Sequence, residues 1–184
     1  LTGADVLSKD MLFATLDPTM RGMKLPSGRR AVLADTVGFI SQLPTELVEA
    51  FKSTLEEVVE ADILVHVHDA SSPMMAEEYD DVCQVLEELG LDAEMQAERV
   101  VHILNKSDQI DDMADATADE TREYLQNLLG SGVFVSAITG AGIDDALQVL
   151  DEKINVDDIR LVVALAPEDG APRAWLHAHG TVHS

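Results

Sequence analysis

The four residues from Asn105 to Asp108 have the types and spacing of a site that reads a purine base. They directly follow the apolar run 100–104, so a polar tetrad stands at the carboxyl end of an expected buried strand, where open α/β sheets bind ligands. The carboxylate of Asp108 can accept two hydrogen bonds, from the N1–H and the exocyclic amine of guanine, while Asn105 and Lys106 brace the ring and the loop. Adenine lacks that pair of donors. The alternative reading is a polar strand-to-helix turn.

Two further loops fall after expected strands in the order that a GTPase uses. Asp35 and Gly38 form an Asp-x-x-Gly element. In a nucleotide triphosphatase an Asp at this place holds Mg²⁺ through water, and the glycine N–H can reach the γ-phosphate because no side chain blocks it. Ser136 begins a loop in which a backbone N–H can contact the guanine O6. Each element alone is also a common structural turn, and their combination is what indicates a nucleotide site.

The segment 12–19 offers two threonines upstream of these loops. Thr15 and Thr19 can bring a hydroxyl to Mg²⁺ and a backbone N–H to a γ-phosphate. The Asp17–Pro18 step disfavours helix and suits a mobile loop, although a plain connector remains the alternative.

The elements that must position these loops alternate between apolar strands and amphipathic helices. This alternation predicts an α/β fold with a mostly parallel sheet, right-handed crossovers and a hairpin edge. A domain covering 1–155 is expected, followed by the beginning of a small α+β unit over 156–184. The expected strands are 23–25 paired with 30–35, then 62–69, 100–104, 133–135 and 159–165, and the expected helices begin at Thr45 and cover 74–89, 119–129, 143–154 and 171–179.

Composition excludes several classes of protein. The chain has 184 residues and a formal net charge of −23, which disfavours contact with bare nucleic acid because phosphate neutralisation needs clustered cations. The acidity fits a salt-adapted source or ordinary solvated helix faces, and both readings stay open. No apolar run approaches a membrane span, and the single Cys83 cannot form an internal disulfide, so we expect a cytoplasmic monomer.

His66 and His68 stand two apart on an expected strand and therefore point to the same face. That spacing is compatible with a metal pair. No carboxylate or third histidine is spaced along the sequence to complete a site, and packing under a helix explains both side chains.

Several stretches closely resemble the HflX family of ribosome-associated GTPases. They are the segments 1–6 and 12–19, the run 35–40 with its sequence Asp-Thr-Val-Gly-Phe-Ile, and the helix from Leu43–Pro44 to Ala61–Asp62. The resemblance covers nearly the whole chain and implies a Ras-like P-loop GTPase domain. No Gly-Lys dipeptide occurs, so the phosphate-binding loop and the first strand of such a domain are missing, and we expect the chain to be a fragment that binds GTP poorly alone.

The resemblance also implies roles for particular residues. The segment 13–17 is the first switch, with Thr15 on Mg²⁺, and the segment 35–38 is the second, with Asp35 on Mg²⁺ through water. The implied GTP contacts are Phe13, Ala14, Thr15, Leu16, Asp17, Asp35, Thr36, Val37, Gly38, Asn105, Lys106, Ser107, Asp108, Ser136, Ala137 and Ile138.

The function implied is hydrolysis of GTP to GDP on the large (50S) ribosomal subunit, with splitting or rescue of ribosomes under stress. Phe39 stands where many GTPases carry a water-orienting Gln, so slow intrinsic hydrolysis is expected until an external group positions the water. A degenerate module that binds without hydrolysing is the second hypothesis. A dinucleotide-binding domain is disfavoured because no Gly-x-Gly-x-x-Gly follows a strand.

Overall fold

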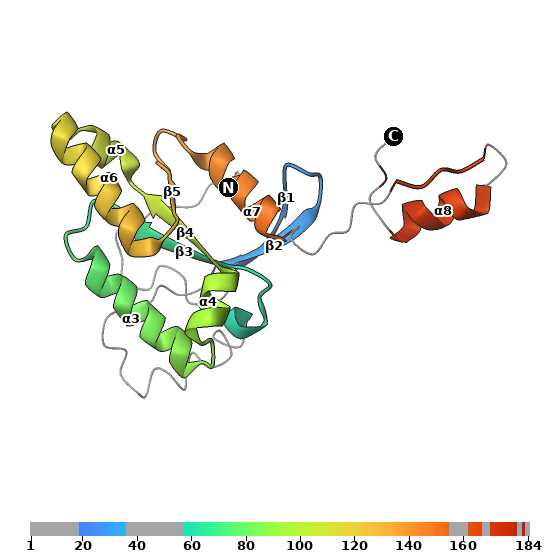
Figure 1. Ribbon diagram of the computed structural model, residues 1–184, viewed down its shortest axis with the longest axis horizontal. Helices are drawn as coiled ribbons and strands as arrows, with labels where there is room; N and C mark the ends of the chain where they lie inside the picture. The colour runs from blue at the N-terminus through green and yellow to red at the C-terminus, as the bar shows by residue number, and fades with distance from the viewer. Residues whose placement is uncertain (1–18, 36–56, 155–161, 167–169, 180–181, 183–184) are drawn as a thin grey trace.

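The structure, a computed structural model, describes residues 19–35, 57–154, 162–166, 170–179 and 182 (Figure 1). Its centre is a parallel sheet of three strands in the order β3–β4–β5. The strands are β3 (Leu64–Asp69), β4 (Val100–Asn105) and β5 (Val133–Phe134). Apolar, largely β-branched runs favour strands, which is why the expected positions of all three are confirmed within two residues.

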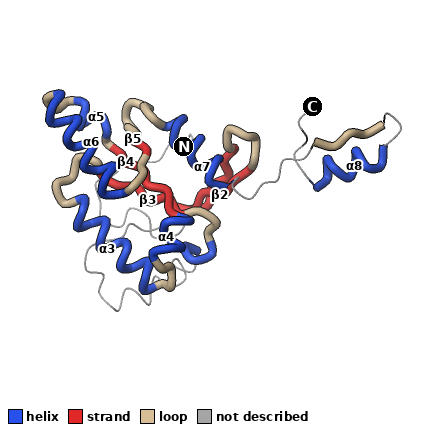
Figure 2. Tube along the Cα trace, in the orientation of Figure 1, coloured by secondary structure: helices blue, strands red, loops and turns tan. Residues whose placement is uncertain are grey.

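Helices cover both faces of this sheet, as Figure 2 shows. One face carries α3 (Met75–Glu88), α5 (Ser107–Asp111) and α6 (Asp115–Leu129). Their apolar side chains surround the fully buried Leu104 in a cluster made of Ala70, Met75, Leu104, Ile110, Leu125 and Leu129. The opposite face carries α7 (Ile143–Ile154), whose Ala146 packs on Ile103 and Val135. Since neighbouring residues of a strand point to opposite faces, Ile103 and Leu104 anchor the two layers.

Two short helices were not expected from the sequence. The helix α4 (Ala93–Arg99) begins where the Asp92 carboxylate accepts a hydrogen bond from the Met95 backbone N–H at 2.9 Å. The helix α5 starts at Ser107, inside the polar tetrad. Both are too short to show a clear 3.6-residue apolar period, the signal on which the expected helices depended.

A separate antiparallel hairpin consists of β1 (Thr19–Lys24) and β2 (Arg30–Asp35). The expected hairpin is therefore confirmed, with a longer first strand that places Thr19 opposite Asp35. Among the described residues the hairpin forms its own two-stranded sheet and is not hydrogen-bonded to β3, so one continuous sheet is not observed there.

The turn of this hairpin is fixed to α7. Asp151 accepts hydrogen bonds from the backbone N–H of Ser27 at 2.5 Å and from its Oγ at 2.6 Å. Beside this contact, Leu25 and Leu150 pack with Val101 of β4. The hairpin thus lies over the α7 side of the parallel sheet.

The expected strand over 159–165 is wrong for the part that is described. Residues 162–166 have no regular secondary structure, and Val162 is 99% exposed. An extended segment becomes a strand only when a neighbour pairs with it, and no ladder among the described residues includes this one. The following helix, α8 (Gly170–His179), confirms the expected helix over 171–179. Within the described residues, no helix is long and apolar enough to cross a bilayer.

Three histidines lie in the layer between the sheet and α3. His66 and His68 are on β3, and His102 is on β4 directly opposite His66. Burial, and the proximity of the other histidine rings, lower the pKa of His66 to about 4 and that of His68 to about 3. Burial also lowers the pKa of His102. All three imidazoles are therefore neutral near pH 7, as a packed core requires.

Candidate nucleotide-binding site

The carboxyl ends of β3, β4 and β5 meet at one edge of the parallel sheet. Asp69 ends β3 opposite Asn105, which ends β4. The backbone continues the ladder beyond the strands, because the Ala70 N–H donates to the Asn105 carbonyl at 2.9 Å and the Ser107 N–H donates to the Val135 carbonyl at 3.0 Å. Three loops are thereby fixed to one another at the edge where open α/β sheets bind ligands.

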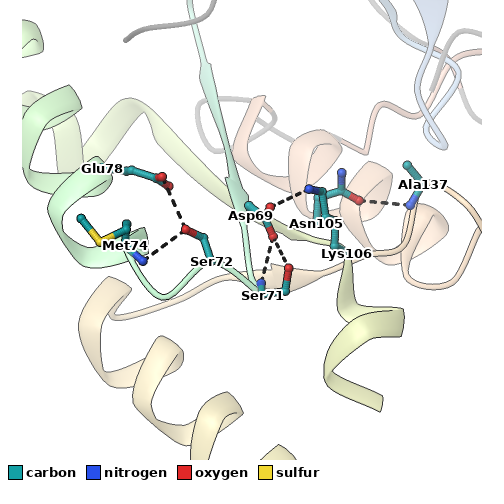
Figure 3. Close-up of polar contacts among 8 residues, drawn as sticks. All are labelled: Asp69, Ser71, Ser72, Met74, Glu78, Asn105, Lys106 and Ala137. Atoms are coloured by element: carbon teal, nitrogen blue, oxygen red, sulfur yellow. Dashed lines mark hydrogen bonds and ion pairs between the residues drawn. The ribbon is translucent and has the colours of Figure 1, made fainter. Parts of the chain in front are cut away.

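Lys106 adopts a left-handed backbone conformation with φ of 66°. For a residue with a Cβ this conformation is uncommon and costs about 1 kcal/mol, so the surrounding contacts must hold it. One such contact is the ion pair of Lys106 Nζ with Asp69 Oδ2 at 2.6 Å (Figure 3). The lysine side chain is consequently held along the edge of the site, pointing back toward β3.

Asp69 is part of this cluster of polar side chains, and the sequence analysis did not single it out. Its other oxygen accepts hydrogen bonds from the Ser71 backbone N–H at 3.0 Å and from Ser71 Oγ at 2.6 Å. Partial burial raises the pKa of this carboxyl, but the hydrogen bonds from Lys106 and Ser71 outweigh it and hold the pKa below the usual 3.8. The signal available in the sequence was a polar side chain at the last position of an apolar strand. Asp69 ends β3 in this way, as Asn105 ends β4.

Asn105 joins the two loops expected to contact the base. Its Oδ1 accepts a hydrogen bond from the Ala137 backbone N–H at 3.1 Å, which crosses from the end of β4 to the loop after β5 (Figure 3). The sequence predicts that Asn105 braces the ring and the loop, and this hydrogen bond is a contact by which its side chain braces the neighbouring loop. The loop 136–138, in which the sequence predicts a backbone donor for the base, is thereby held beside the tetrad.

The loop after β5 is held by its own hydrogen bonds. Ser136 is fully buried, and its Oγ accepts from the Thr139 N–H at 3.1 Å. Its backbone N–H donates to the Ala141 carbonyl at 2.9 Å, and its carbonyl accepts from the Gly140 N–H at 2.8 Å. Ile138, in contrast, is 84% exposed at the tip. The loop therefore presents Ala137 and Ile138 on a rigid turn.

Asp108 lies in the first turn of α5, between these two loops in sequence. Its Oδ1 is buried and has no hydrogen-bond partner within the described part of the chain. Leaving a buried acceptor unsatisfied costs about 1–3 kcal/mol, so this oxygen calls for a donor. Among the described residues expected to bind the base, Asp108 is the one with a buried side-chain oxygen that lacks a hydrogen-bond partner.

The residues expected on the phosphate side are mostly outside the described residues. Asp35 is described, as an exposed side chain at the carboxyl end of β2. The segment 13–17, the residues Thr36, Val37 and Gly38, and Phe39 lie outside. The structure thus brings together the residues after β4 and β5 that are expected to contact the base, and the phosphate contacts stay predictions.

Comparisons with known proteins point to GTP-binding proteins. A family model described as "50S ribosome-binding GTPase" matches residues 1–106. A protein named GTPase HflX from Magnetococcus marinus is 44% identical, over 99% of this chain and 40% of that protein. The GTPase HflX of Escherichia coli is 38% identical, over 99% of this chain and 43% of its own length. The chain therefore spans about two fifths of the length of these curated relatives.

A solved structure shares the fold. The crystal structure of a GTP-binding protein from the hyperthermophilic archaeon Sulfolobus solfataricus in complex with GDP superimposes with a TM-score of 0.59 at 23% identity. The match covers 75% of this chain and 44% of that one. The expected P-loop GTPase fold class is thereby confirmed.

Proposed function

Because the chain belongs to the family of 50S ribosome-binding GTPases, we propose that Asn105, Lys106 and Asp108 read the guanine of GTP in a protein that hydrolyses GTP to GDP. The resemblance to the HflX GTPases that the sequence predicts is confirmed by relatives with 38% to 44% identity over nearly the whole chain. The observation that carries the proposal is the buried, unpartnered Oδ1 of Asp108 beside two interlocked loops.

Guanine supplies what this carboxylate lacks. The N1–H and the C2 amine of the base are neighbouring donors, so they can pair with the two oxygens of Asp108. The Asp69 ion pair holds Lys106 at the edge of the site, and Asn105 fixes the loop 136–138, from which a backbone N–H would contact O6. Adenine places an acceptor at N1 and carries no amine at C2, so it would leave the buried oxygen unsatisfied.

The phosphate side of the proposal depends on Asp35 and Thr15. The exposed carboxylate of Asp35 at a strand end offers the hard oxygen that Mg²⁺ prefers, and it would hold the ion through water while Thr15 supplies a hydroxyl. When bound, Mg²⁺ neutralises charge on the β- and γ-phosphates. The segment 13–17 and the residues Thr36, Val37 and Gly38 would then surround the γ-phosphate.

The partner proposed is the large ribosomal subunit, with ribosome splitting or rescue under stress as the process served, in the cytoplasm. Phe39 has no polar atom with which to orient water, so fast hydrolysis needs a group from the partner. The organisation proposed is a GTPase domain up to about residue 155 and a small unit after it, acting as a monomer.

Nucleotide affinity of the full-length gene product tests the base-reading residues. Asp108→Ala should weaken GDP binding in calorimetry by at least about 10-fold, because a charged hydrogen-bond acceptor contributes about 1.5–3 kcal/mol. The matched control is Asp112→Ala, an exposed aspartate one turn further along. Equal affinities for the two variants, or equal binding of ADP and GDP by the unchanged protein, would refute the assignment.

GTP turnover separates the enzyme from a module that only binds. We expect slow release of phosphate by the full-length gene product alone and faster release when purified large ribosomal subunits are added. Tight GDP binding without turnover in either condition would favour the non-hydrolysing module.

A further inference from the structure

Three imidazoles from two neighbouring strands converge in the layer under α3, and none of them is among the residues expected to contact GTP. His66 and His68 come from β3 and His102 comes from β4, and each offers a ring nitrogen within 4.8 Å of those of the other two. Parallel pairing places His66 directly opposite His102, and the two-residue period of β3 places His68 on the same face. Sequence spacing could not show this, because the third histidine is 34 positions away from His68 along the chain.

The cluster lies in a covered layer of the protein. His68 is 5% exposed and the other two rings are half-buried. The Tyr79 ring of α3 lies over all three, with ring centroids 6.1 Å from His66, 6.0 Å from His68 and 5.7 Å from His102. The three imidazole rings are therefore packed beneath an aromatic ring of α3.

Packing alone leaves this cluster incompletely satisfied. His68 Nε2 and His102 Nδ1 share one hydrogen bond at 3.0 Å. The Nδ1 atom of His66 is buried and has no partner among the described residues. A valine at each position would fill a β-strand interior without unsatisfied polar atoms, so three histidines here call for another explanation.

We propose that His66, His68 and His102 form a three-histidine binding site for a divalent transition-metal ion, with Zn²⁺ as the ion that fits best. Imidazole nitrogen is a preferred ligand of Zn²⁺, and Zn²⁺ imposes no geometry of its own beyond a preference for four ligands. With Zn–N bonds of about 2.0–2.1 Å, tetrahedral ligands stand roughly 3.3 Å apart. The three nitrogens are therefore within small side-chain rotations of a binding geometry, with water as the fourth ligand.

Binding requires no loss of protons from the protein. Each neutral imidazole has one protonated and one unprotonated nitrogen. One proton now lies between His68 Nε2 and His102 Nδ1. On metal binding, the ring that carries this proton changes tautomer and holds the proton on its other nitrogen. The lone pairs of His68 Nε2 and His102 Nδ1 are then both available to the metal. The site then carries the two positive charges of the ion, in a protein whose formal net charge is −23.

The position of this site links it to the loops at the end of the sheet. His68 directly precedes Asp69, and His102 lies three residues before Asn105. A bound ion would therefore join the carboxyl-terminal halves of β3 and β4. The ion stabilises the strand pair and takes no part in contacting GTP.

Metal titration of the full-length gene product tests the proposal. The purified protein, without a histidine tag, is stripped with a chelator and titrated with Co²⁺ in excess Mg²⁺, which occupies surface carboxylates. We expect one equivalent of Co²⁺ with visible d–d absorption, displaced by one equivalent of Zn²⁺, and a Tm that rises with Zn²⁺.

Variants decide whether the three histidines are the ligands. His102→Val should weaken Zn²⁺ binding at least about 100-fold, since removing a ligand costs more than the loss of an outer-shell partner. The matched control, His177→Ala, removes an exposed histidine of α8 and should leave the affinity unchanged. Absence of stoichiometric binding by the unchanged protein, or equal binding by His102→Val and His177→Ala, would overturn the proposal. If His102→Val does not fold, X-ray absorption of the Zn²⁺-loaded unchanged protein still decides, because fewer than three imidazole ligands would refute it.

Discussion

The start of α7 depends on a glycine that almost touches the backbone of β5. Gly142 has φ of +71°, and a Cβ built on it lies 2.0 Å from the Phe134 carbonyl oxygen and 3.3 Å from the Val135 Cα. Gly140, two residues earlier in the same loop, has φ of +83° and no atom within 4 Å of a built Cβ. Comparing alanine substitutions at these two glycines separates conformational strain from steric contact. Both positions have a positive φ, but of the two only Gly142 also has a close contact.

The size of the difference follows from these contacts. Gly140→Ala incurs only the left-handed conformation, which costs about 1–2 kcal/mol for a residue with a Cβ. Gly142→Ala incurs the same cost, and its new methyl must move more than an ångström away from backbone atoms that cannot rotate aside. Such a shift disturbs the first hydrogen bond of α7, from the Ala146 N–H to the Gly142 carbonyl at 3.0 Å. We expect Gly142→Ala to reduce the free energy of unfolding by about 3–5 kcal/mol, the upper range for single substitutions.

Urea unfolding followed by circular dichroism measures both variants of the full-length gene product. The predicted outcome is a midpoint that falls at least about twice as far for Gly142→Ala as for Gly140→Ala, with unchanged m values. GDP affinity should fall for Gly142→Ala as well, because the displaced segment carries Ala137. Equal destabilisation by the two substitutions would refute the close approach of this loop to β5.

Three other predictions concern residues around the same sheet. Asp69→Asn, which removes the ion pair with the lysine of the tetrad, should weaken GDP binding about 3- to 10-fold in calorimetry, whereas Glu78→Gln, at an exposed hydrogen bond, should not. An unchanged affinity for Asp69→Asn would contradict the positioning role. Leu104→Ala should lower the free energy of unfolding by about 2–5 kcal/mol, because Leu104 is fully buried. Val67→Ala, at a residue 58% exposed, should change it by less than about 1 kcal/mol. Equal effects of the two substitutions would contradict the burial of Leu104 in the core. Burial raises the pKa of the Cys83 thiol above 9.0, so iodoacetamide should modify it more slowly in the folded than in the urea-unfolded protein at pH 8, with the rate rising as the pH passes above 9. Equal rates in the two states would contradict the partial burial of this thiol.

Local signals in the sequence account for most of the central fold. The apolar runs that became β3 and β4 are long enough to identify without knowing their neighbours, and Gly90 and Gly130 mark helix ends by their positive φ. The tetrad from Asn105 to Asp108 is recognisable for the same reason, because its chemistry is contiguous in the chain.

Features that depend on contacts between distant segments were not predictable. Asp69 becomes part of the site only through Lys106, and His102 becomes the third histidine of its cluster only through the register of β4 against β3. The segment 162–166 shows the converse error, since its apolar residues suit a strand but no described segment pairs with it. Local periodicity can be identified within one stretch of sequence, whereas the partner with which a strand pairs cannot.

The base preference of Asp108→Asn in the full-length gene product tests the central claim most directly. Xanthine carries a carbonyl at C2 in place of the amine of guanine, so an asparagine side chain can donate where the aspartate accepted. Competition between GTP and xanthosine triphosphate should therefore favour GTP in the unchanged protein and xanthosine triphosphate in the variant. An undiminished preference of the variant for GTP would contradict the assignment of Asp108 as the residue that reads guanine.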